Sequence, residues 1–377
     1  MAIETPYGGT VGPGGDFRKS GVSRWPDADL GPGDEIILET PGYDDYQLQD
    51  DDDDRDVQTL DLSRVHPIGG PVAVRGAEPG DLLVVDLIDI RPLSGIGYSA
   101  VLPGMGGPLR SWFPRGFKSV WDCKGGFATS RHVPGVRIPA MPHPGVIGVA
   151  PSIDLLERWN AREDPLIAEE KAAPRGAAAS TTVLRTLEGE TRERVARDAA
   201  RTVPPRENGG NVDIKNLSTG ARVYLPVFVE TALFSLGDVH FAEGDGEVTW
   251  NAIEMDGATH VRLDLVKGAA RTYGIRTPVF EPGPLEPRLT RWLTFTGVNA
   301  RDDRQGYLDC TWAALDALEQ AVEYLMKFGF SGEQAYTIIS VAPVEMRISS
   351  MVDIPNACVT LAVPRDVFDR DIVPAAS

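Results

Sequence analysis

Glycine and proline recur so often along this chain that they limit the length of any helix. There are 40 glycines and 30 prolines among 377 residues, spread over most of the sequence. Both residues destabilise the interior of a helix, and proline also lacks the backbone donor that a helix needs. This distribution favours short strands joined by turns, so we expect a protein dominated by β-sheet.

The chain is longer than the roughly 250–300 residues at which a single hydrophobic core stops growing. Apolar residues make up 42% of it and charged residues 24%, as in ordinary globular proteins. Residues 1–34 are rich in Gly, Pro and Asp without a periodic apolar pattern, which predicts an extended N-terminal arm anchored by Phe17 and Trp25. Residues 35–377 should then form one compound region of intergrown β subdomains.

The charge balance narrows the choice of partners. With 55 acidic and 37 basic residues, the net charge is −18. Such an excess repels phosphate backbones and anionic lipids, so we expect no nucleic acid and no membrane as partners, and a small neutral or cationic substrate fits better. The sequence shows neither an apolar run of the roughly 20 residues that span a membrane nor the pattern of a secretory signal.

The cysteines point to a reducing compartment. There are three, an odd number, and they lie far apart without C-x-x-C spacing: Cys123, Cys310 and Cys358. This pattern suggests neither a disulfide framework nor a zinc ribbon. We therefore expect a cytoplasmic protein.

In the first half of the chain, apolar runs predict strands. Glu35–Glu39 has a strand pattern, and Pro71–Val74 and Leu82–Ile90 form a hairpin-like pair around a Gly/Pro turn. Residues 93–150 are dense in Gly, Pro and aromatic residues, which predicts a long set of functional loops. Ser152 should cap a short helix. Residues 164–206 are polar and weakly helical, and we interpret them as a surface insertion.

In the second half, strands return and helices follow. Strand patterns occupy RVYLPVFVETALFSL, EVTWNAIEM and HVRLDLVKG from Arg222 onward. A helix pair is predicted over 311–342, with the first helix at Thr311–Phe328 and a capping box of Ser331 and Gln334 at the start of the second. A strand at 357–363 closes the fold. This order argues for an α+β, mainly β protein.

Two polar clusters flank an apolar stretch that we interpret as a buried hairpin or strand pair. The first is ENGGNVD, Glu207–Asp213, and the second is LGDVHFAEGDGE, Leu236–Glu247. Asp238 and His240 are spaced i, i+2, so both should point to one face of an extended segment, as two ligands of one metal ion would. Both clusters can then project from neighbouring strand ends into one site.

The residue types in these clusters suit the hydrolysis of a neutral, poorly reactive group. We assign Asp213, Asp238 and His240 as ligands of a divalent metal, with zinc favoured, because zinc lowers the pKa of its water to about 7. Catalytic roles go to Glu247, which would move the proton, and to Glu243 and Asn211. Substrate-binding roles go to Asn208, Gly209, Gly210 and His143, with backbone N–H groups at 209–211 or the Asn211 amide steadying an oxyanion. Glycines 237, 244 and 246 would let the substrate approach.

A structural interpretation of the same residues stays open. Asp and Gly commonly make turns, and His240 would then be hydrogen-bonded in a half-buried strand. Elsewhere, Cys123 is either a nucleophile or a buried inert thiol, whereas His66 and His132 have structural hydrogen bonds as their simplest role. The acidic run Asp50–Asp54 is a solvated loop or a cation site, and Glu345 and Arg347 should form a structural pair.

Long segments in order resemble one family, the acetamidase/formamidase family. They include VHPIGGPVAVRGAEPGDLLVVDLIDI, WDCKGGFATSRHVPGVRIPAMPHPGVIGVAPS and ENGGNVDIKNLSTGARVYLPVFVETALFSLGDVHFAEGDGEVTWNAIEM. YGIRTPVFEPGP and GFSGEQAYTIISVAPVEMRISSMVDIPNACVTLAVP continue the likeness, which covers about residues 35–370. The chain looks more like the longer, formamidase branch than like the short acetamidases.

The resemblance implies hydrolysis of formamide or similar short amides to the carboxylic acid and ammonia. It implies a fold of β-sandwich and β-barrel elements with a small α/β portion, and assembly into homo-oligomers. The family's Gly-Gly-Asn-x-Asp element falls on Gly209, Gly210, Asn211 and Asp213, its Gly-Asp-x-His element on Gly237, Asp238 and His240, and its Gly-Asp-Gly-Glu element on Gly244 to Glu247.

Three departures from the family pattern lie in or beside this site. Asn208 stands where the family commonly has His, and Glu243 stands where Gln or Met is usual. The segment EVTWNAIEM is one residue shorter than usual and lacks its Cys. These changes could redirect the substrate range. A lactamase or other cyclic-amide or urea-like hydrolase, and a non-catalytic amide-binding or scaffold member of the family, therefore remain alternatives.

Overall fold

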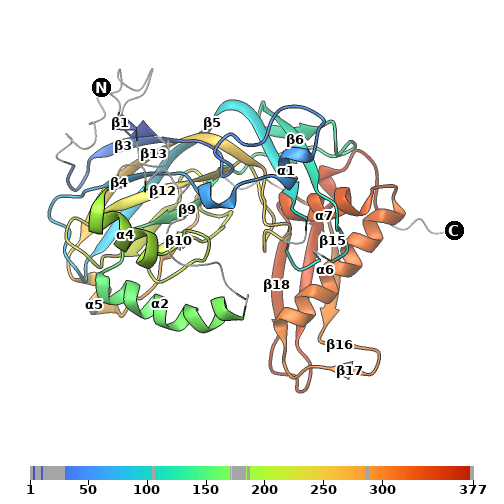
Figure 1. The fold of residues 1–377 in the computed structure, drawn as a ribbon. Coiled ribbons are helices and arrows are strands. Elements are labelled where there is room, and N and C mark those ends of the chain that lie inside the picture. The colour runs from blue at the N-terminus through green and yellow to red at the C-terminus, as the bar shows by residue number, and fades with distance from the viewer. Residues whose placement is uncertain are drawn as a thin grey trace.

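The computed structural model describes residues 30–373, apart from 104–106, 110, 170, 172–183, 185–186 and 285–288, together with two short strands, β1 (Ile3–Glu4) and β2 (Thr10–Val11). Most of the predicted arm 1–34, with its anchors Phe17 and Trp25, lies outside the described residues, as does part of the 164–206 insertion. The described chain is mainly β with few helices, as expected (Figure 1).

Two long strands form the centre of a 14-stranded sheet, β5 (Leu82–Val101) and β13 (Glu254–Val266). They pair antiparallel along most of β13, and β3 (Glu35–Thr40) pairs with the other edge of β13. Alternate residues such as Val85, Val261 and Leu263 are fully buried. Each such side chain contributes about 1.5–3 kcal/mol through its removal from water. The strand order continues from β5 through β6 (Phe117–Lys124), β7 (Phe127–Ser130) and β8 (Ile138–Pro139).

A branch of this sheet places the polar clusters together. Strand β12 (Phe234–His240) pairs with β9 (His143–Gly148), with β4 (Ile68–Val72) and, at its last two residues, with β13. Strand β10 (Gly209–Asn211) pairs with the other edge of β9. Because β12 ends between β9 and β13, the loops after β10 and β12 emerge on the same side as the start of β13.

The C-terminal part forms a smaller antiparallel sheet with its own helices, drawn in orange and red in Figure 1. Its strand order is β15 (Trp292–Val298), β19 (Cys358–Pro364), β18 (Glu345–Ser350), and α6 (Cys310–Lys327) packs on β15 and β19. The predicted helix pair is confirmed. Gly329 follows α6 with φ +92°, and Ser331 and Gln334 form the capping box of α7 (Gly332–Val341).

The remaining elements are short or peripheral. Helix α2 (Ile153–Ala168) begins at the predicted cap, where the Ser152 side chain accepts from Leu155 N–H. The others are α1 (Arg55–Gln58), α4 (Gly189–Asp198), α5 (Ala269–Tyr273), β11 (Arg222–Pro226), β14 (Val279–Glu281), β16 (Ala300–Arg301), β17 (Arg304–Gln305) and two 3₁₀ turns at Leu62–Arg64 and Arg365–Val367. Among the described residues, no helix is long and apolar enough to cross a membrane.

Several predicted local structures were wrong. Strands β4 and β5 do not pair with each other, so Pro71–Val74 and Leu82–Ile90 form no hairpin. Region 93–150 is not mainly loops, because β5 continues through Pro92 to Val101 and four further strands follow. Pro92 lies opposite Gly257, where the register of the β5–β13 pairing shifts, and a proline is tolerated at such a bulge.

The apolar stretch between the polar clusters is also not a hairpin. Strand β11 pairs with β5 and β14, whereas β12 pairs with β13, β4 and β9. The segment EVTWNAIEM is mostly turns and enters a strand only at Glu254. Positive φ angles at Glu247 (+39°) and Trp250 (+68°) are incompatible with extended backbone there.

The expected β-barrel is not found among the described strands, since their pairings branch without returning to a starting strand. The finer description as β-sandwich and β-barrel elements therefore remains a prediction, as do the boundaries of the arm, the insertion and the compound region.

Candidate active site

The register of three neighbouring strands puts His240 at the centre of the site. On β12, His240 lies directly opposite His143 of β9 and, on its other edge, opposite Glu254 of β13. Residues paired in this way have Cβ atoms about 4.5–5.5 Å apart, within reach of their side chains. His143 and His240 are 0% exposed and Glu254 is 2% exposed. These three side chains therefore meet inside the protein.

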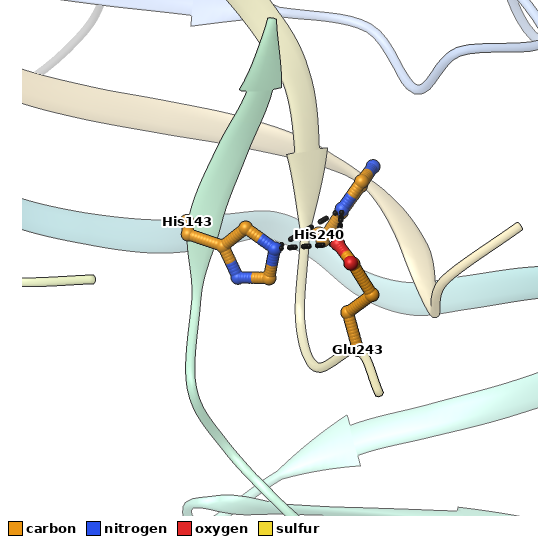
Figure 2. Close-up of side chains that lie close together, drawn as sticks. All are labelled: His143, His240 and Glu243. Carbon is orange, nitrogen blue, oxygen red and sulfur yellow. Dashed lines mark hydrogen bonds and ion pairs between the residues drawn. The ribbon is translucent and has the colours of Figure 1, made fainter. Parts of the chain in front are cut away.

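On one side of the His240 ring, three ligand-type atoms form a small triangle (Figure 2). Oε2 of Glu243 lies 2.9 Å from Nε2 of His143 and 2.9 Å from Nδ1 of His240, and the two ring nitrogens are 3.2 Å apart. Nδ1 of His143 lies 2.8 Å from the Met141 carbonyl oxygen, to which it must donate. The Nε2 lone pair of a neutral His143 ring therefore faces the Glu243 carboxylate, and this contact needs a proton or a cation between them.

On the other side of the ring lie two buried carboxylates. Nε2 of His240 is 3.2 Å from Oε2 of Glu254 and 3.5 Å from Oδ2 of Asp238. Asp238 and His240 therefore lie close together, as expected, although Asp238 has φ +56° and so is not part of a regular extended segment. Nε2 of His66 lies 3.8 Å from the same Asp238 oxygen, and Thr202 Oγ1 lies 3.1 Å from the other ring nitrogen of His66.

A third group gives the site its accessible side. Asp213 and Glu247 each have a carboxylate oxygen within 4.8 Å of a His240 ring nitrogen and of each other. Asn211 Nδ2 donates to Oδ2 of Asp213 at 2.8 Å. Asp213 and Glu247 are partly exposed, whereas His143, His240, Glu243, Asp238 and Glu254 are buried. Of these seven side chains, Asp213 and Glu247 are therefore the nearest to solvent.

The backbone at the site is unusually constrained. Asp213, Asp238 and Glu247 have φ angles of +45°, +56° and +39°, in the left-handed region that non-glycine residues seldom adopt. Such strain gathers at functional sites, where the surrounding structure enforces it. A Cβ at Gly145 of β9 would lie 2.7 Å from Asp238 Oδ2, 2.7 Å from His240 Cε1 and 2.8 Å from Asp213 Oδ1. Only glycine leaves room for these side chains to converge.

Burial and mutual repulsion raise the pKa values of some carboxyl groups in the site, whereas neighbouring histidines lower the pKa of another. Burial, together with the charges of Asp213 and Glu243, raises the pKa of Glu247 well above its usual value, and burial and Glu243 do the same for Asp213. Burial raises the pKa of Glu254 to about 7. Burial would also raise the pKa of Asp238, but the charges of His66 and His240 hold it at about 2. Groups with separated pKa values are typical of catalytic sites.

The charged ring of His240 is stabilised in this setting, and Glu243 is ionised. Burial opposes a charge on His240, but Glu254 and Asp238 outweigh it and raise the pKa of His240 well above its usual value. Burial likewise opposes ionisation of Glu243, yet hydrogen bonds from His143 and His240 lower its pKa.

Five oxygens in the site are buried and have no hydrogen-bond partner in the part of the chain that the structure describes: Asn211 Oδ1, Asp213 Oδ1, Asp238 Oδ1, Glu243 Oε1 and Glu254 Oε2. A buried acceptor without a partner costs about 1–3 kcal/mol. Their concentration in one place indicates that a bound group satisfies them.

The structure brings the two predicted clusters together but gives some members other contacts. Asn208 Nδ2 donates to the Val149 carbonyl at 2.6 Å, and the Gly209 N–H donates to the Arg206 carbonyl at 3.1 Å, so that N–H is not available to an oxyanion. A Cβ at Gly209 would lie 2.2 Å from Ile147 O. Gly210 lies beside it on β10 with φ +89°. Substrate contacts of Asn208, Gly209, Gly210 and His143 remain predictions.

Glycines 237 and 244 have packing roles that the sequence did not suggest. A Cβ would meet Ile68 backbone at 2.9 Å from Gly237, and the Ile339 and Ala342 carbonyls at 2.5 and 2.6 Å from Gly244. Their missing side chains admit neighbouring protein backbone, and Gly246 alone of the three has a positive φ, +94°.

Other candidates proved structural. Cys123 is buried, and burial raises the pKa of its thiol to about 12, which contradicts an activated nucleophile. His132 Nδ1 accepts from Val120 N–H. The acidic run forms ion pairs with basic side chains of the same chain. Lys118 Nζ lies 2.8 Å from Asp51, and Arg131 pairs with Asp50 and Asp52. Glu345 and Arg347 form the expected pair.

Sequence reasoning missed Glu254 and His66. Glu254 stood in a predicted strand, and only the pairing of β12 with β13 places it against His240. His66 lies more than a hundred residues from Asp238 in sequence, and proline next to it gave no hint of the contact. An acid at a strand end opposite a histidine is a useful signal once strand pairing is known.

Comparison with known proteins decides the family, because the profile of the Acetamidase/Formamidase family matches residues 19–370. The chain belongs to this family. It is 44% identical over 369 residues to a formamidase of Methylophilus methylotrophus, covering 94% of this chain and 91% of that protein. It is 45% identical over 354 residues to an acetamidase of Mycolicibacterium smegmatis, covering 88% and 87%.

Two solved structures share the fold. A gamma lactamase from Delftia acidovorans has a TM-score of 0.87 and 45% identity, over 92% of this chain and 88% of that one. A predicted acetamidase/formamidase from Thermoanaerobacter tengcongensis has a TM-score of 0.51 at 24% identity, over 89% and 88%. The resemblance seen in the sequence is confirmed.

Proposed function

We propose that this member of the acetamidase/formamidase family is an amidohydrolase that cleaves the C–N bond of a short linear amide, such as formamide, to give a carboxylic acid and ammonia. The observation that carries the proposal is the convergence of Asp213, His240 and Glu247 within 4.8 Å, in a chain 44% identical to a formamidase over nearly its whole length.

The triangle of His143, His240 and Glu243 fits a divalent cation. Ligand atoms around a tetrahedral zinc with bonds of about 2.0–2.2 Å lie roughly 3.3–3.5 Å apart. The three edges here are 2.9, 2.9 and 3.2 Å, so small outward shifts would produce that spacing. The Met141 carbonyl fixes the His143 ring through its other nitrogen, as is usual for a metal-binding histidine.

The residues that would hold the cation are His143, His240 and Glu243, in place of the set Asp213, Asp238 and His240 that the sequence suggested. The carboxylates of Asp213 and Glu247 belong to a second group that shares His240. Zinc suits the mixture of imidazole and carboxylate ligands. When bound, such a cation would polarise the amide carbonyl and lower the pKa of a water beside it.

Glu247 is placed to manage protons. In the reaction, water adds to the carbonyl carbon, the C–N bond breaks, and the departing nitrogen needs a proton to leave as ammonia. Burial and neighbouring carboxylates raise the pKa of Glu247 well above its usual value, which favours its protonated form and suits a group that transfers protons. Its partial exposure lets it face a bound substrate.

Asn211 is placed to orient the amide. Its Nδ2 is held by Asp213, which directs the carboxamide, and its Oδ1 is buried without a partner among the described residues. That oxygen can accept a hydrogen bond from the substrate's own NH₂ group. An unfilled acceptor of this kind favours an amide over an ester, which has no N–H to offer.

A second candidate substrate class is the γ-lactams. The solved structure with a TM-score of 0.87 is titled a gamma lactamase, at 45% identity. A lactam keeps an N–H for Asn211 but holds its amide in the cis form within a ring. Substrate preference between linear and cyclic amides therefore separates the two functions.

The proposal also includes the location of the protein in the cell and its oligomeric state. We place the enzyme in the cytoplasm because its three cysteines are free. We propose homo-oligomers, since the sequence resemblance implies them. Several large apolar side chains near the β18–β19 turn, including Met351, Val352 and Ile354, are more than half exposed and could contribute to such contacts.

Product release from a panel of amides tests the function. Ammonia is measured for the linear amides and for urea, and the ring-opened γ-amino acid is measured for a γ-lactam, whose hydrolysis releases no ammonia. With zinc supplied, formamide, acetamide, propionamide, urea and a γ-lactam would be compared at equal concentrations. Formamide or acetamide should be fastest. A γ-lactam as the best substrate favours the lactamase alternative, and hydrolysis product from none of the five contradicts hydrolysis and favours an amide-binding protein.

Two variants test the site. His240→Ala removes the central ring and should reduce turnover to the background rate. Glu247→Gln keeps the shape and should reduce kcat by about 10²- to 10⁴-fold. Circular dichroism verifies that each variant is folded. Near wild-type turnover in a folded Glu247→Gln protein would remove Glu247 from the proposed chemistry.

A further inference from the structure

Lys215 connects the two loops that form the accessible side of the site. Its Nζ donates to Oδ1 of Asp245. Lys215 follows Asp213 by two residues, and Asp245 lies midway between Glu243 and Glu247. Lys215 is 7% exposed, so its ammonium is largely removed from water. The pair therefore joins the segment that carries Asp213 to the segment that carries Glu247.

Asp245 is itself fixed to the C-terminal helical part. Its Oδ2 accepts from Met346 N–H at 2.9 Å, and its own N–H donates to the Val344 carbonyl at 3.1 Å. The neighbouring Gly244 N–H donates to the Ser340 carbonyl at 2.7 Å. The loop after β12 thus rests on the junction of α7 and β18, and Lys215 binds the loop after β10 to that support.

Stability alone does not explain an ion pair whose lysine is buried and whose aspartate is partly buried. Removing two charges from water offsets most of their attraction, and apolar replacements are often equally stable. An ion pair does, however, fix the relative position of the two segments that it joins. Here those segments carry the carboxylates of Asp213 and Glu247, which lie close together despite their mutual repulsion. We propose that Lys215 and Asp245 are a positioning pair, which fixes Glu247 relative to Asp213. This inference rests on the proposed function of the same site.

Paired substitutions test the assignment. Lys215→Met and Asp245→Asn each remove the charge pair with little change in size. Each should lower kcat on formamide by about 10²-fold with little change in KM, because binding contacts remain while the reacting groups are misplaced. In the double variant, the loss should be smaller than the product of the single losses, since both substitutions remove one interaction.

Lys118→Met is the matched control. Lys118 is also buried, at 3% exposure, and also pairs with carboxylates, those of Asp51 and Asp56, but it lies on β6 outside the site. The Lys118→Met protein should lose thermal stability but keep the kcat of the wild type. Equal kcat losses in Lys118→Met and Lys215→Met, or multiplicative losses in the double variant, would overturn the positioning role.

Hydrogen exchange tests the positioning role of the pair without measuring catalysis. In Lys215→Met and Asp245→Asn, backbone amides of residues 241–253 should exchange faster than in the wild type, and in Lys118→Met they should not. Unchanged exchange in both site variants would also overturn the inference. A wild type that hydrolyses no amide would instead count against the proposed function, and the exchange result would still stand.

Discussion

Glu207 shows how a single ion pair at the edge of the site makes stability depend on pH. Its carboxylate accepts from Arg162 and from Trp159 Nε1 at 2.7 Å. The hydrogen bond with Arg162 is the main reason that its pKa falls from 4.5 to about 2. Because the pKa is lowered on folding, the ionised group stabilises the fold above about pH 4.5, and this stabilisation disappears as the pH falls toward 2.

Glu207→Gln should therefore destabilise the protein at pH 6 and much less at pH 3. The measurement is the free energy of unfolding in urea for both proteins at each pH. A difference between them that stays constant from pH 6 to pH 3 would show that the Glu207 charge does not stabilise the fold.

At the residue scale, sequence could predict which residues matter but not how they meet. Asp213, His240 and Glu247 were recognisable by type and by family pattern, and the structure places them together. Glu254 and His66 were not recognisable, because their role depends on strand register and on a contact across distant parts of the chain. Asn208 and Gly209 were expected to face the substrate, but Asn208 donates to the carbonyl of Val149, which is distant in sequence, and the Gly209 N–H donates to the Arg206 carbonyl in a local turn.

At the scale of elements, helix α7 supports the loop that carries Glu247 through hydrogen bonds. Tyr336 Oη donates to the Val248 carbonyl, and Ser340 Oγ donates to the Asn251 carbonyl at 2.7 Å and accepts from Thr249 N–H at 3.1 Å. These bonds replace the strand pairing that the turns of this loop cannot make. The loop is thus held in place although it has little regular structure.

Ser340→Ala should lower the free energy of unfolding by about 1–3 kcal/mol, because the buried Thr249 N–H loses its acceptor. It should also reduce turnover, since the loop gains freedom. Thr337→Val in the same helix is the control, because the buried Thr337 hydroxyl has no partner among the described residues. Thermal melts and amide turnover compare the two. Equal effects of the two substitutions would contradict a supporting role for Ser340.

Elements defined by local signals were predicted best. Helices α6 and α7 and the start of α2 follow from apolar periodicity and from caps within a few residues of the helix ends. The strand pairings were not predictable in the same way. Strand β12 has three partners, β13, β4 and β9, that come from distant parts of the chain, and β5 runs through residues that look like turn formers.

At the scale of the whole molecule, the site concentrates negative charge inside the protein. Five carboxylates surround His240: Asp213, Asp238, Glu243, Glu247 and Glu254. A cation that binds only the folded state would relieve their repulsion and stabilise the fold by about 2.7 kcal/mol at a free concentration 100 times its Kd.

Removing divalent cations should therefore lower the Tm. The experiment compares thermal melts of the protein after dialysis against a chelator, with and without added zinc, and measures metal content in parallel. We expect the Tm to fall on chelation and to return with zinc but not with magnesium, because the inner ligands include two imidazoles. An unchanged Tm in a protein proven free of metal would contradict a resident cation.

Gly145 sets a boundary on how this enzyme can be altered. The innermost surface of the site at this point is bare main chain, and even a methyl group there would collide with Asp213, Asp238 and His240. Position 145 is therefore closed to larger residues. Attempts to widen the range of accepted molecules, in the laboratory or over evolutionary time, must change other residues around the site.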